Sequence, residues 1–512
     1  MNTFTWIAIA VYLIGMISVG IYFSKRTKST SEYFLGGRKL GPFVTAMSAE
    51  ASDMSSWLLM GLPGVALAGG LCEASWTAIG LAVGTYINFL IVAKRIRVYS
   101  SKIDAVTVPE FFSKRFGDGG KILSVVSALV IVIFFIPYTA SGFNACGTLF
   151  NSLSGGDIPY RTAMLVSAAV IVAYTALGGF LAASTTDFVQ SIVMTLALVV
   201  VVFFGVGYAG GWSSVVENAK NLPSFTSLLS SYDMKSGASG GSYGVLNIIS
   251  TVAWGLGYFG MPHILLRFMA IKDSKKLTAS RRIATSWVVV SMGVAILIGV
   301  IGSAAVSNGA ISLTAENSQR IIIEIAKKIG ENGIFFALLT GIIISGILAS
   351  TMSTADSQLL AASSSISKDL LGDVFGLKIS QKKSMIISRL TIVVIAVVAV
   401  FWAWNEDSVF TIVSFAWAGF GAAFGPVVLF SLFWKRTTKW GALAGMITGG
   451  AMVFIWKYLI SKLGGVFKIY ELLPAFVLAC VALVVVSLLT KKPDESVEKT
   501  FIEVSAEVKA KA

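Results

Sequence analysis

Residues 48–64 read SAEASDMSSWLLMGLPG and stand inside a long apolar stretch of the chain. The first ten are small or polar apart from Met54 and Trp57, and Glu50 and Asp53 are acidic. A carboxylate near the centre of a membrane helix costs about 2.5–3.5 kcal/mol, so it needs a cation, a proton or hydrogen-bond donors beside it. The stretch therefore predicts an interrupted helix with Asp53 as a candidate binding residue. A structural hydrogen bond to the nearby serines is the alternative.

A second interrupted stretch lies at residues 254–262, which read WGLGYFGMP. Three glycines and one proline within nine residues weaken helical hydrogen bonding, because glycine adds backbone freedom and proline lacks an N–H. Matching interruptions in two halves of a chain point to the central site of a secondary transporter, where an ion and a solute satisfy the freed backbone groups. Close helix packing through glycine is the alternative interpretation.

Apolar blocks dominate the rest of the chain. Of the 512 residues, 55% are hydrophobic and 13% are charged, whereas soluble proteins have about 45–50% apolar and about 25% charged residues. About thirteen blocks have roughly the 20-residue length that crosses a bilayer. They cover approximately residues 4–23, 43–68, 74–93, 123–149, 160–182, 186–210, 245–271, 285–306, 334–362, 384–404, 409–434, 440–461 and 468–490. Long apolar runs without alternation exclude a β-barrel, so we predict an all-α integral membrane protein in a lipid bilayer.

Lys and Arg residues are concentrated in alternate gaps between the blocks. The odd-numbered gaps hold cation clusters such as those at residues 25–28, 94–97 and 281–282. Because cytoplasmic loops carry excess cations, these gaps are predicted to lie inside. The N-terminus is then outside and the C-terminus cytoplasmic, in a multi-pass protein of the cell membrane. Membrane topology also explains the net charge of +14 without nucleic-acid binding.

The two interrupted blocks are five blocks apart, so they cross the membrane in opposite directions. This relation is expected of an inverted repeat, with halves at about residues 43–210 and 245–434. We therefore assign residues 1–490 to one membrane transporter domain. Residues 211–244 are rich in Ser and Gly and are expected to form an outer surface loop. Residues 491–512 mix Lys with Glu and are predicted to be a partly disordered cytoplasmic tail.

Further polar groups lie within apolar blocks. Residues 350–357 read STMSTADS, and their hydroxyl oxygens suit a hard cation; hydroxyls that bond to their own helix are the alternative. Asp187 opens one block and is either a helix cap or a functional carboxylate. Aromatic candidates for a pocket beside the interruptions are Trp57, Tyr138, Trp254 and Tyr258.

The chain lacks the motifs of ATP-driven transport and of ordinary enzyme chemistry. It contains no Walker motif, no CxxC, no HExxH and no nucleophile elbow. Its three cysteines have no paired spacing, which argues against a disulfide framework or a zinc knuckle. We therefore predict a secondary transporter and not an enzyme, with no obligate protein partner evident.

Four stretches resemble the sodium/solute symporter family, and in particular its proline-transporting members. They are ASDMSSWLLMGLPG (51–64), AWGLGYFGMPHIL (253–265), MSTADSQLL (352–360) and AWAGFGAAFGPVVLFSLFW (416–434). The resemblance runs through nearly all of the chain. It implies a LeuT-type fold, in which two inverted five-helix repeats follow one leading helix and precede two trailing helices. It also implies symport of L-proline with Na⁺ by alternating access.

The resemblance implies roles for individual residues as well. A sodium site is expected between the first and eighth helices of the repeats, with Asp53 as its critical carboxylate. The implied sodium ligands are the carbonyl groups of Ala51, Met54 and Ser350 and the hydroxyl groups of Ser353 and Thr354. Proline is expected near Ser55, Trp57, Tyr138, Trp254, Tyr258 and Pro262. Arg38 is expected to act in the transport cycle on the cytoplasmic side, and Asp187 is a candidate second cation position.

Three alternative functions remain. The first is symport of another solute, such as a sugar, betaine or pantothenate. The second is a proton-coupled carrier, which would take up solute in response to a pH gradient without sodium. The third is a membrane sensor, which would bind a solute without moving it. Uptake measured over a small panel of solutes, with and without sodium, separates all three.

Overall fold

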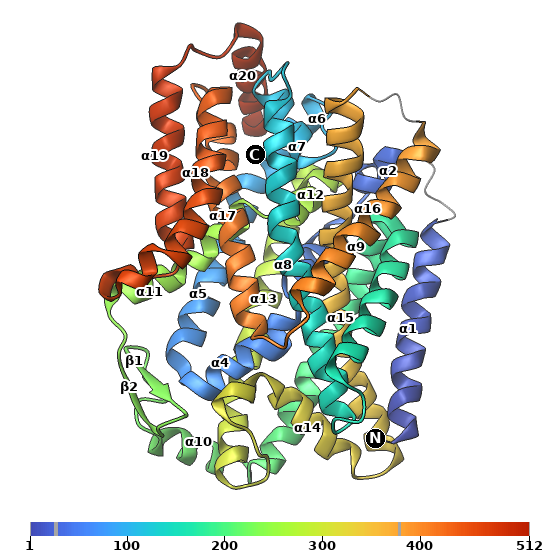
Figure 1. The fold of residues 1–512 in the computed structure, drawn as a ribbon, viewed down its shortest axis with the longest axis vertical. Helices are drawn as coiled ribbons and strands as arrows, with labels where there is room; N and C mark the ends of the chain where they lie inside the picture. The colour runs from blue at the N-terminus through green and yellow to red at the C-terminus, as the bar shows by residue number, and fades with distance from the viewer. Residues whose placement is uncertain (1, 25–28, 377–379, 511–512) are drawn as a thin grey trace.

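The computed structural model describes residues 2–24, 29–376 and 380–510. Helices make up most of this part of the chain, and most of them run along the long axis of the molecule (Figure 1). The helices that contain the apolar blocks are α1 (Thr3–Ser24), α3 (Pro42–Asp53), α4 (Leu62–Gly69), α5 (Leu71–Ile87), α6 (Lys94–Lys102), α8 (Ile122–Leu153), α9 (Tyr160–Tyr208), α11 (Val245–Val252), α12 (Pro262–Ala270), α13 (Leu277–Ser307), α15 (Ile334–Ser364), α16 (Gln381–Trp402), α17 (Val409–Phe433), α18 (Lys439–Tyr458) and α19 (Leu472–Leu489).

Shorter elements connect these helices. The short α-helices and the two strands are α2 (Thr30–Leu35), α7 (Val108–Arg115), α10 (Trp212–Asn221), α14 (Ile321–Gly330), α20 (Glu495–Ala510), β1 (Ser230–Asp233) and β2 (Ala238–Ser242). The 3-10 and π segments are η1 (Gly36–Arg38), η2 (Trp57–Gly61), η3 (Asn88–Ala93), η4 (Ala253–Phe259), η5 (Ser274–Lys276), η6 (Ala315–Arg320), η7 (Ser365–Val374), η8 (Ile460–Leu463) and η9 (Gly465–Phe467).

Eleven of the thirteen predicted blocks coincide with a helix or a series of helical segments of their own, and the other two, 160–182 and 186–210, both lie in α9. Within the described residues, ten helices are long and apolar enough to cross a membrane, or eleven if one bent pair is counted as a span. The remaining two blocks, 43–68 and 160–182, contain the shorter apolar helices Trp57–Gly69 and Tyr160–Ala176. The prediction of an all-α membrane protein is therefore confirmed. Interrupting a helix shortens its continuous part, which is why the block at 43–68 falls below the length of a span.

Block two is interrupted where its polar residues stand. Helix α3 ends at Asp53, and Met54 leaves the helical region with φ −74° and ψ 64°. The chain then passes through Ser55 and Ser56 into the π segment η2 and the helix α4. Proline at the second position of α4 suits a helix start, because its missing N–H would have no partner there. The predicted break is therefore present beside Asp53.

Block seven is broken in a different way. Helix α11 tightens into the 3-10 segment η4, and α12 follows after Gly260 and Met261 at an angle of 46°. The glycines of this segment also allow close packing: a Cβ on Gly257 would lie 2.0 Å from Nε1 of Trp417, and one on Gly255 would lie 2.3 Å from the carbonyl oxygen of Gly80. Both interpretations of the glycines, interruption and close packing, thus apply here.

Residues 160–208, predicted as two blocks, form one bent element. Helix α9 contains Gly179 with φ 70° and ψ −178°, which is a conformation that only glycine adopts easily. A Cβ there would also lie 2.9 Å from the ring of Tyr33. The break between the two predicted blocks is therefore a bend at Gly179, inside the predicted block 160–182, whereas the predicted gap at 183–185 is helical.

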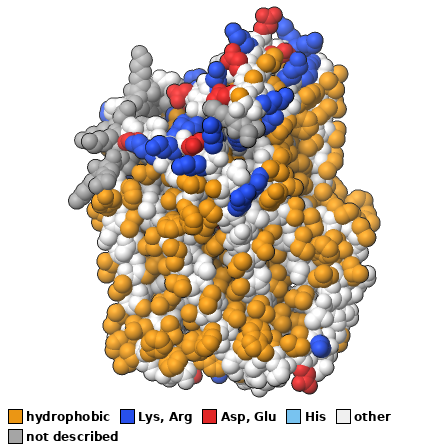
Figure 2. Space-filling model, turned by 180° about the vertical axis from the view of Figure 1, so that it is seen from behind, with side chains coloured by type: hydrophobic (Ala, Val, Ile, Leu, Met, Phe, Trp, Pro, Cys, Tyr) orange, Lys and Arg blue, Asp and Glu red, His pale blue; other side chains and the backbone are white. Residues whose placement is uncertain are grey.

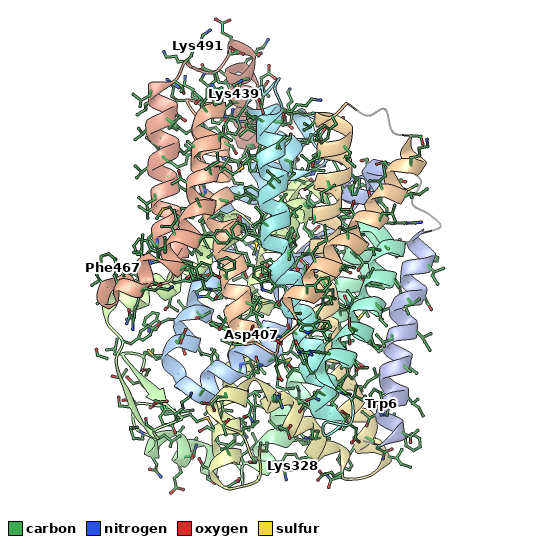
Figure 3. All side chains as sticks on the ribbon, viewed as in Figure 1. Trp6, Lys328, Asp407, Lys439, Phe467 and Lys491 are labelled. Atoms are coloured by element: carbon green, nitrogen blue, oxygen red, sulfur yellow. The ribbon has the colours of Figure 1, made fainter. Side chains whose placement is uncertain are left out.

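Charged side chains gather at one end of the molecule. Figure 2 shows Lys and Arg side chains crowded at the upper end, above a broad hydrophobic surface. Lys439 and Lys491 lie at this end, whereas Trp6 and Lys328 lie near the opposite end (Figure 3). We refer to the former as the basic end. The apolar belt and its basic border match the surface expected of a protein that crosses a bilayer.

Two regions outside the apolar blocks differ from the sequence-based expectation. Residues 211–244 contain the helix α10 and an antiparallel hairpin of β1 and β2, in addition to loop. The tail was expected to be partly disordered, which is wrong for Glu495–Ala510, because these residues form α20. This helix packs on α6, with Val504 buried and a 3.0 Å ion pair between Lys102 and Glu503. Tertiary contact stabilises a segment whose charged composition alone does not favour a fold.

Candidate functional site between the two broken helices

The hydroxyl cluster of α15 meets the break in block two. The Ser353 hydroxyl donates to the carbonyl oxygen of Ala51 at 2.7 Å and lies 3.2 Å from the carbonyl oxygen of Ser350. The Thr354 hydroxyl donates to the same Ser350 carbonyl at 3.1 Å. All four residues are buried. Four of the five ligands expected for sodium are therefore joined in one group of oxygen atoms.

Most of these hydroxyls also bond within their own helix. Ser350 donates to Ile347 at 2.8 Å, and Thr354 bonds only to Ser350 among the described residues. Ser353 is the member that reaches across to block two. The fifth expected ligand, the Met54 carbonyl, has no recorded hydrogen bond to α15; the Met54 amide caps α3 by donating to Glu50 at 2.7 Å. An oxygen-only group with a free carbonyl at a helix end suits Na⁺ by its donor chemistry.

Asp53 joins three different blocks. Its carboxylate oxygen Oδ2 accepts a 2.6 Å hydrogen bond from the Tyr258 hydroxyl of η4. Its backbone carbonyl accepts from Trp57 Nε1 at 3.2 Å and from the Tyr138 hydroxyl at 3.3 Å. The other carboxylate oxygen, Oδ1, is buried and has no hydrogen-bond partner among the described residues. Among the described residues, its side chain therefore has no bond to the nearby serines that the alternative interpretation required, and block seven supplies the donor.

The predicted aromatic residues lie around this carboxylate. The rings of Trp57 and Trp254 have centroids 6.4 Å apart, and Tyr258 makes an edge contact of 5.1 Å with Trp417. Trp417 also donates from Nε1 to the carbonyl of Trp254 at 2.7 Å. Trp417 was not among the predicted site residues, although it stands in the stretch 416–434 that carried the family resemblance.

The remaining two predicted substrate residues are placed differently. The Ser55 hydroxyl lies at the break and accepts from the backbone amide of Trp57 at 3.4 Å. Pro262 is buried at the first position of α12, where it starts the helix after the second break. No polar or ring contact recorded for the described residues ties Pro262 to the aromatic group. Its expected part in substrate binding stays a prediction.

An outer group of aromatic residues covers Trp254. Its indole stacks on Tyr470 at 5.0 Å and contacts Phe410 at 5.2 Å. These three residues line part of a cavity of about 800 Å³, together with charged residues that include Glu73, Lys457 and Glu471. Tyr470 stands just before α19, in the predicted block 468–490, which is the second trailing helix of the predicted fold. No motif in the sequence marks it. Three-dimensional packing brings it to the site.

Asp187 forms a buried ion pair with Arg267. Arg267 of α12 donates to Asp187 Oδ2 at 3.0 Å and to the hydroxyl of Ser48 at 3.0 Å. Ser48 itself donates to Asp187 Oδ2 at 2.6 Å, and Arg267 also contacts Ser357. Sequence reasoning missed Arg267, although a positive charge inside the apolar block 245–271 is a signal that could have found it. A cation at the predicted second position would have to share Asp187 with this guanidinium.

Arg38 joins three segments of the chain by hydrogen bonds. Its guanidinium donates to the Met269 carbonyl at 2.8 Å, to the Ala105 carbonyl at 2.7 Å and to the Ser100 carbonyl at 3.1 Å. Burial, with Arg97 nearby, lowers the pKa of Arg38 to about 10, so the group stays charged at neutral pH. Arg38 therefore connects the end of α12 to α6 and to the loop that follows it. Its expected part in the transport cycle stays a prediction.

Known proteins resemble this chain in sequence over its full length. The osmoregulated proline transporter OpuE of Bacillus subtilis is 44% identical over 497 residues, covering 97% of this chain and 96% of that protein. The sodium/proline symporter of Haemophilus influenzae is 44% identical over 504 residues, covering 97% and 96%. The sodium/proline symporter of Staphylococcus aureus (strain USA300) is 40% identical over 519 residues, covering 100% and 97%.

Solved structures share the fold. A Na⁺-coupled sialic acid symporter in a substrate-bound outward-open state matches with a TM-score of 0.78 at 18% identity, covering 96% of this chain and 99% of that chain. MhsT in complex with L-phenylalanine matches with a TM-score of 0.55 at 13% identity, covering 88% and 98%. The prediction of a LeuT-type fold is confirmed by these likenesses.

The model of the family described as the sodium:solute symporter family matches residues 33–449. This range holds both broken helices, the hydroxyl cluster of α15 and the aromatic group around Asp53. Together with relatives at 40–44% identity over nearly the whole chain, the match decides the family that the resemblance had suggested. This protein belongs to the sodium:solute symporter family.

Proposed function

We propose that this protein imports L-proline together with Na⁺ across the cell membrane by alternating access. The names of three relatives support the solute, since each is described as a proline transporter or a sodium/proline symporter. The single observation that carries the coupling is the contact of Ser353 with the Ala51 carbonyl, at the point where α3 ends. It places a carbonyl freed by the break against hydroxyls of another helix.

Sodium binding would join the two helices at this point. The ion takes oxygen ligands from Ala51, Ser350, Ser353 and Thr354, with the Met54 carbonyl completing the set. It replaces a hydroxyl–carbonyl hydrogen bond with a charged contact, and this stabilises the unwound end of α3. Asp53 is the last residue of α3, so its orientation depends on how this end of the helix is held. Binding of sodium is thereby linked to the shape of the aromatic group.

Proline would lie against the aromatic group between the two breaks. The rings of Trp57 and Trp254 offer apolar faces to the pyrrolidine ring, and Tyr138 and Tyr258 offer hydroxyl groups to its charged ends. The free Oδ1 of Asp53 is a further acceptor in this space. The membrane potential supplies about 2.3 kcal/mol per charge per 100 mV. One Na⁺ per zwitterionic proline therefore gives the substantial accumulation that an importer needs.

We infer that the repeats at about 43–210 and 245–434 are the moving units. Contacts between them support this assignment. Helix α8 of the first half packs on α17 of the second, and α15 of the second half packs on α9 of the first. Blocks four and nine correspond in the two repeats, as do blocks six and eleven, so these two pairings are related by exchange of the halves. Rocking of one unit against the other would open the site to alternate sides.

We infer that the basic end faces the cytoplasm, which puts the N-terminus outside and the C-terminus inside. The gathering of Lys and Arg at one border of the apolar belt supports this direction (Figure 2). Single cysteines at Lys328 and Lys491, in a variant without native cysteines, test it. A membrane-impermeant maleimide should label Lys328→Cys in intact cells and Lys491→Cys only in permeabilised cells. The opposite pattern would reverse the topology.

Transport is tested with the purified protein in proteoliposomes. Uptake of labelled proline is measured with an inward sodium gradient, with equal sodium on both sides, and with a proton gradient in choline buffer. Accumulation only under the sodium gradient is expected. Equal uptake in all three conditions refutes the coupling, and uptake driven by protons alone identifies a proton-coupled carrier.

Competition by unlabelled solutes then tests the substrate. Proline should displace the label, and a sugar, betaine or pantothenate should not. Stronger competition by one of these solutes would replace proline as the substrate. Saturable binding of proline without any uptake would identify a sensor. Binding and uptake are measured on the same preparation, so a loss of uptake can be distinguished from a loss of binding.

A further inference from the structure

A cavity of about 410 Å³ lies at the basic end, outside the site described above. It is bordered by η3 and the start of α6, by η5 and the start of α13, and by Ala510 at the end of α20. Three cationic side chains line it: Lys94, Lys275 and Arg281. The described lining residues include no acid, and they include the hydroxyl groups of Ser274 and Thr278. The lining therefore combines positive charge with neutral hydrogen-bond donors, which is the chemistry that recognises a phosphate group.

Arg281 is held in a defined position at this cavity. Its guanidinium carbon lies 5.0 Å from the centroid of the Tyr86 ring, so the ring supports one face of the side chain. Its Nε is buried and has no hydrogen-bond partner among the described residues. Asp273, which precedes the lining residue Ser274, uses Oδ1 to accept from the backbone amide of Lys275 at 2.9 Å. Arg281 itself lines the cavity, so its guanidinium places a positive charge there in a fixed position.

The other wall of the cavity is apolar, and one of its residues, Leu90, is exposed at the surface. Phe89, Leu90 and Leu277 contribute to the lining. Leu90 is 47% exposed and Tyr86 is 43% exposed, and both stand in the apolar helix Leu71–Lys102 that is long enough to cross the membrane. Exposed apolar side chains on a membrane helix contact acyl chains. The cavity therefore lies where the apolar belt meets the basic end.

We propose that this cavity binds an anionic phospholipid, with the phosphate between Lys275 and Arg281 and the acyl chains along Leu90. A soluble phosphate would contact the cations but not the apolar wall. A zwitterionic lipid would place its own positively charged headgroup near the cations, which would repel it. Anionic lipid headgroups are the partners that basic clefts between membrane helices select. That the lipid belongs to the cytoplasmic leaflet rests on the orientation proposed above.

Native mass spectrometry of the full-length protein in detergent tests the proposal. The protein is titrated with phosphatidylglycerol, with phosphatidylcholine and with sn-glycerol 3-phosphate. Phosphatidylglycerol should remain bound at concentrations at which phosphatidylcholine does not. Loss of both cations in a Lys275→Gln/Arg281→Gln variant should weaken phosphatidylglycerol binding about 30-fold. A Lys435→Gln variant is the control, because Lys435 is exposed in the connection between α17 and α18 and does not line the cavity.

The outcomes distinguish a lipid phosphate from a soluble phosphate, and they distinguish the proposed lipid site from the proposed proline transport. Equal binding of phosphatidylglycerol and phosphatidylcholine overturns the lipid site, as does equal weakening in the Lys435→Gln control. Competition by sn-glycerol 3-phosphate at the same concentration as the lipid replaces it with a soluble phosphate site. If the double variant fails to fold, the three titrations of the unchanged protein still decide. Proline uptake is measured separately, so a protein that binds the lipid but does not transport proline refutes only the proposed transport.

Discussion

The two broken helices differ in what their breaks do with the backbone. In block two the helix ends at Asp53, and the Ala51 carbonyl turns to the Ser353 hydroxyl of α15. In block seven the backbone tightens into η4, and glycines bring it against neighbouring helices with no room for a side chain at Gly257. One break exposes polar backbone atoms to side-chain oxygens, and the other brings backbones into close contact.

This difference assigns separate tasks to the two halves of the site. The break in block two provides oxygen atoms, which suit a cation. The break in block seven provides a shape, because it positions Tyr258 and Trp254 around Asp53. The hydrogen bond from Tyr258 to Asp53 joins the two. Ion binding is therefore expected to depend on side-chain chemistry in one half, and folding is expected to depend on side-chain volume in the other.

The largest expected effect comes from Asp53→Asn. Removing a buried, hydrogen-bonded charge costs about 2–3 kcal/mol, so the sodium concentration for half-maximal proline uptake should rise about 30- to 150-fold. Uptake at a series of sodium concentrations in proteoliposomes measures it. Asp407→Asn, which changes an exposed carboxylate in the connection between α16 and α17, should leave the value unchanged. An unaltered sodium requirement in the Asp53 variant removes that residue from the ion site.

Gly257→Ala should break the close packing at block seven. The added Cβ would meet Trp417, and overpacking of a buried position costs about 1–3 kcal/mol. Thermal unfolding in detergent should show a melting temperature several degrees lower than that of the unchanged protein. Gly293→Ala is the matched control, because nothing lies within 4 Å of its added Cβ on α13. Similar melting temperatures for both variants would contradict the packing role.

Ser353→Ala should affect ions more than folding. It removes one expected ligand and the bond to the Ala51 carbonyl, a loss of about 1–1.5 kcal/mol that corresponds to a sodium affinity about tenfold weaker. Sodium-dependent uptake measures the effect. Ser364→Ala on the same helix is the control, since its recorded bond goes to Ala361 of its own helix. Equal sodium affinities in the two variants would show that the contact of Ser353 with the Ala51 carbonyl does not contribute to sodium binding.

The smallest effect is expected far from both breaks, at Glu110 of α7. Burial opposes ionisation of this carboxyl, but Lys368, Lys114 and the Val106 amide outweigh it and hold its pKa below the usual 4.5. Because the pKa is lowered on folding, the stabilisation is present above the unfolded value and is lost as the pH falls through the folded one. Glu110→Gln should therefore lower stability by less than about 1 kcal/mol at neutral pH.

Unfolding curves recorded from pH 6 down to pH 3 test this sign. The difference between the unchanged protein and Glu110→Gln should shrink as the pH falls below about 4.5. Sodium affinity should stay the same, since Glu110 touches neither break. A difference that grows on acidification would mean that the ionised carboxylate destabilises the fold, contrary to its short contacts with Lys114 and Lys368.

Part of the site was visible in the sequence because it violates the rules of a membrane helix. Asp53 and the glycines from Gly255 to Gly260 stand out in apolar blocks, and both breaks occur in the structure where they were expected. The hydroxyl run at 350–357 was equally visible. Its members were not distinguishable, however, because a hydroxyl that bonds to its own helix and one that bonds to another helix have the same sequence. Ser353 was separated from Ser350 only by the position of Ala51.

The sequence by itself determined that the chain is an all-α membrane protein with two defective helices, since apolar length and misplaced polar groups are local properties. Tertiary structure alone decided which partners complete the defects. Tyr258 faces Asp53, Arg267 pairs with Asp187, and Tyr470 stacks on Trp254, across separations in the chain that no local pattern encodes. Burying a charge or a freed carbonyl requires a partner, and packing chooses which distant residue that partner is.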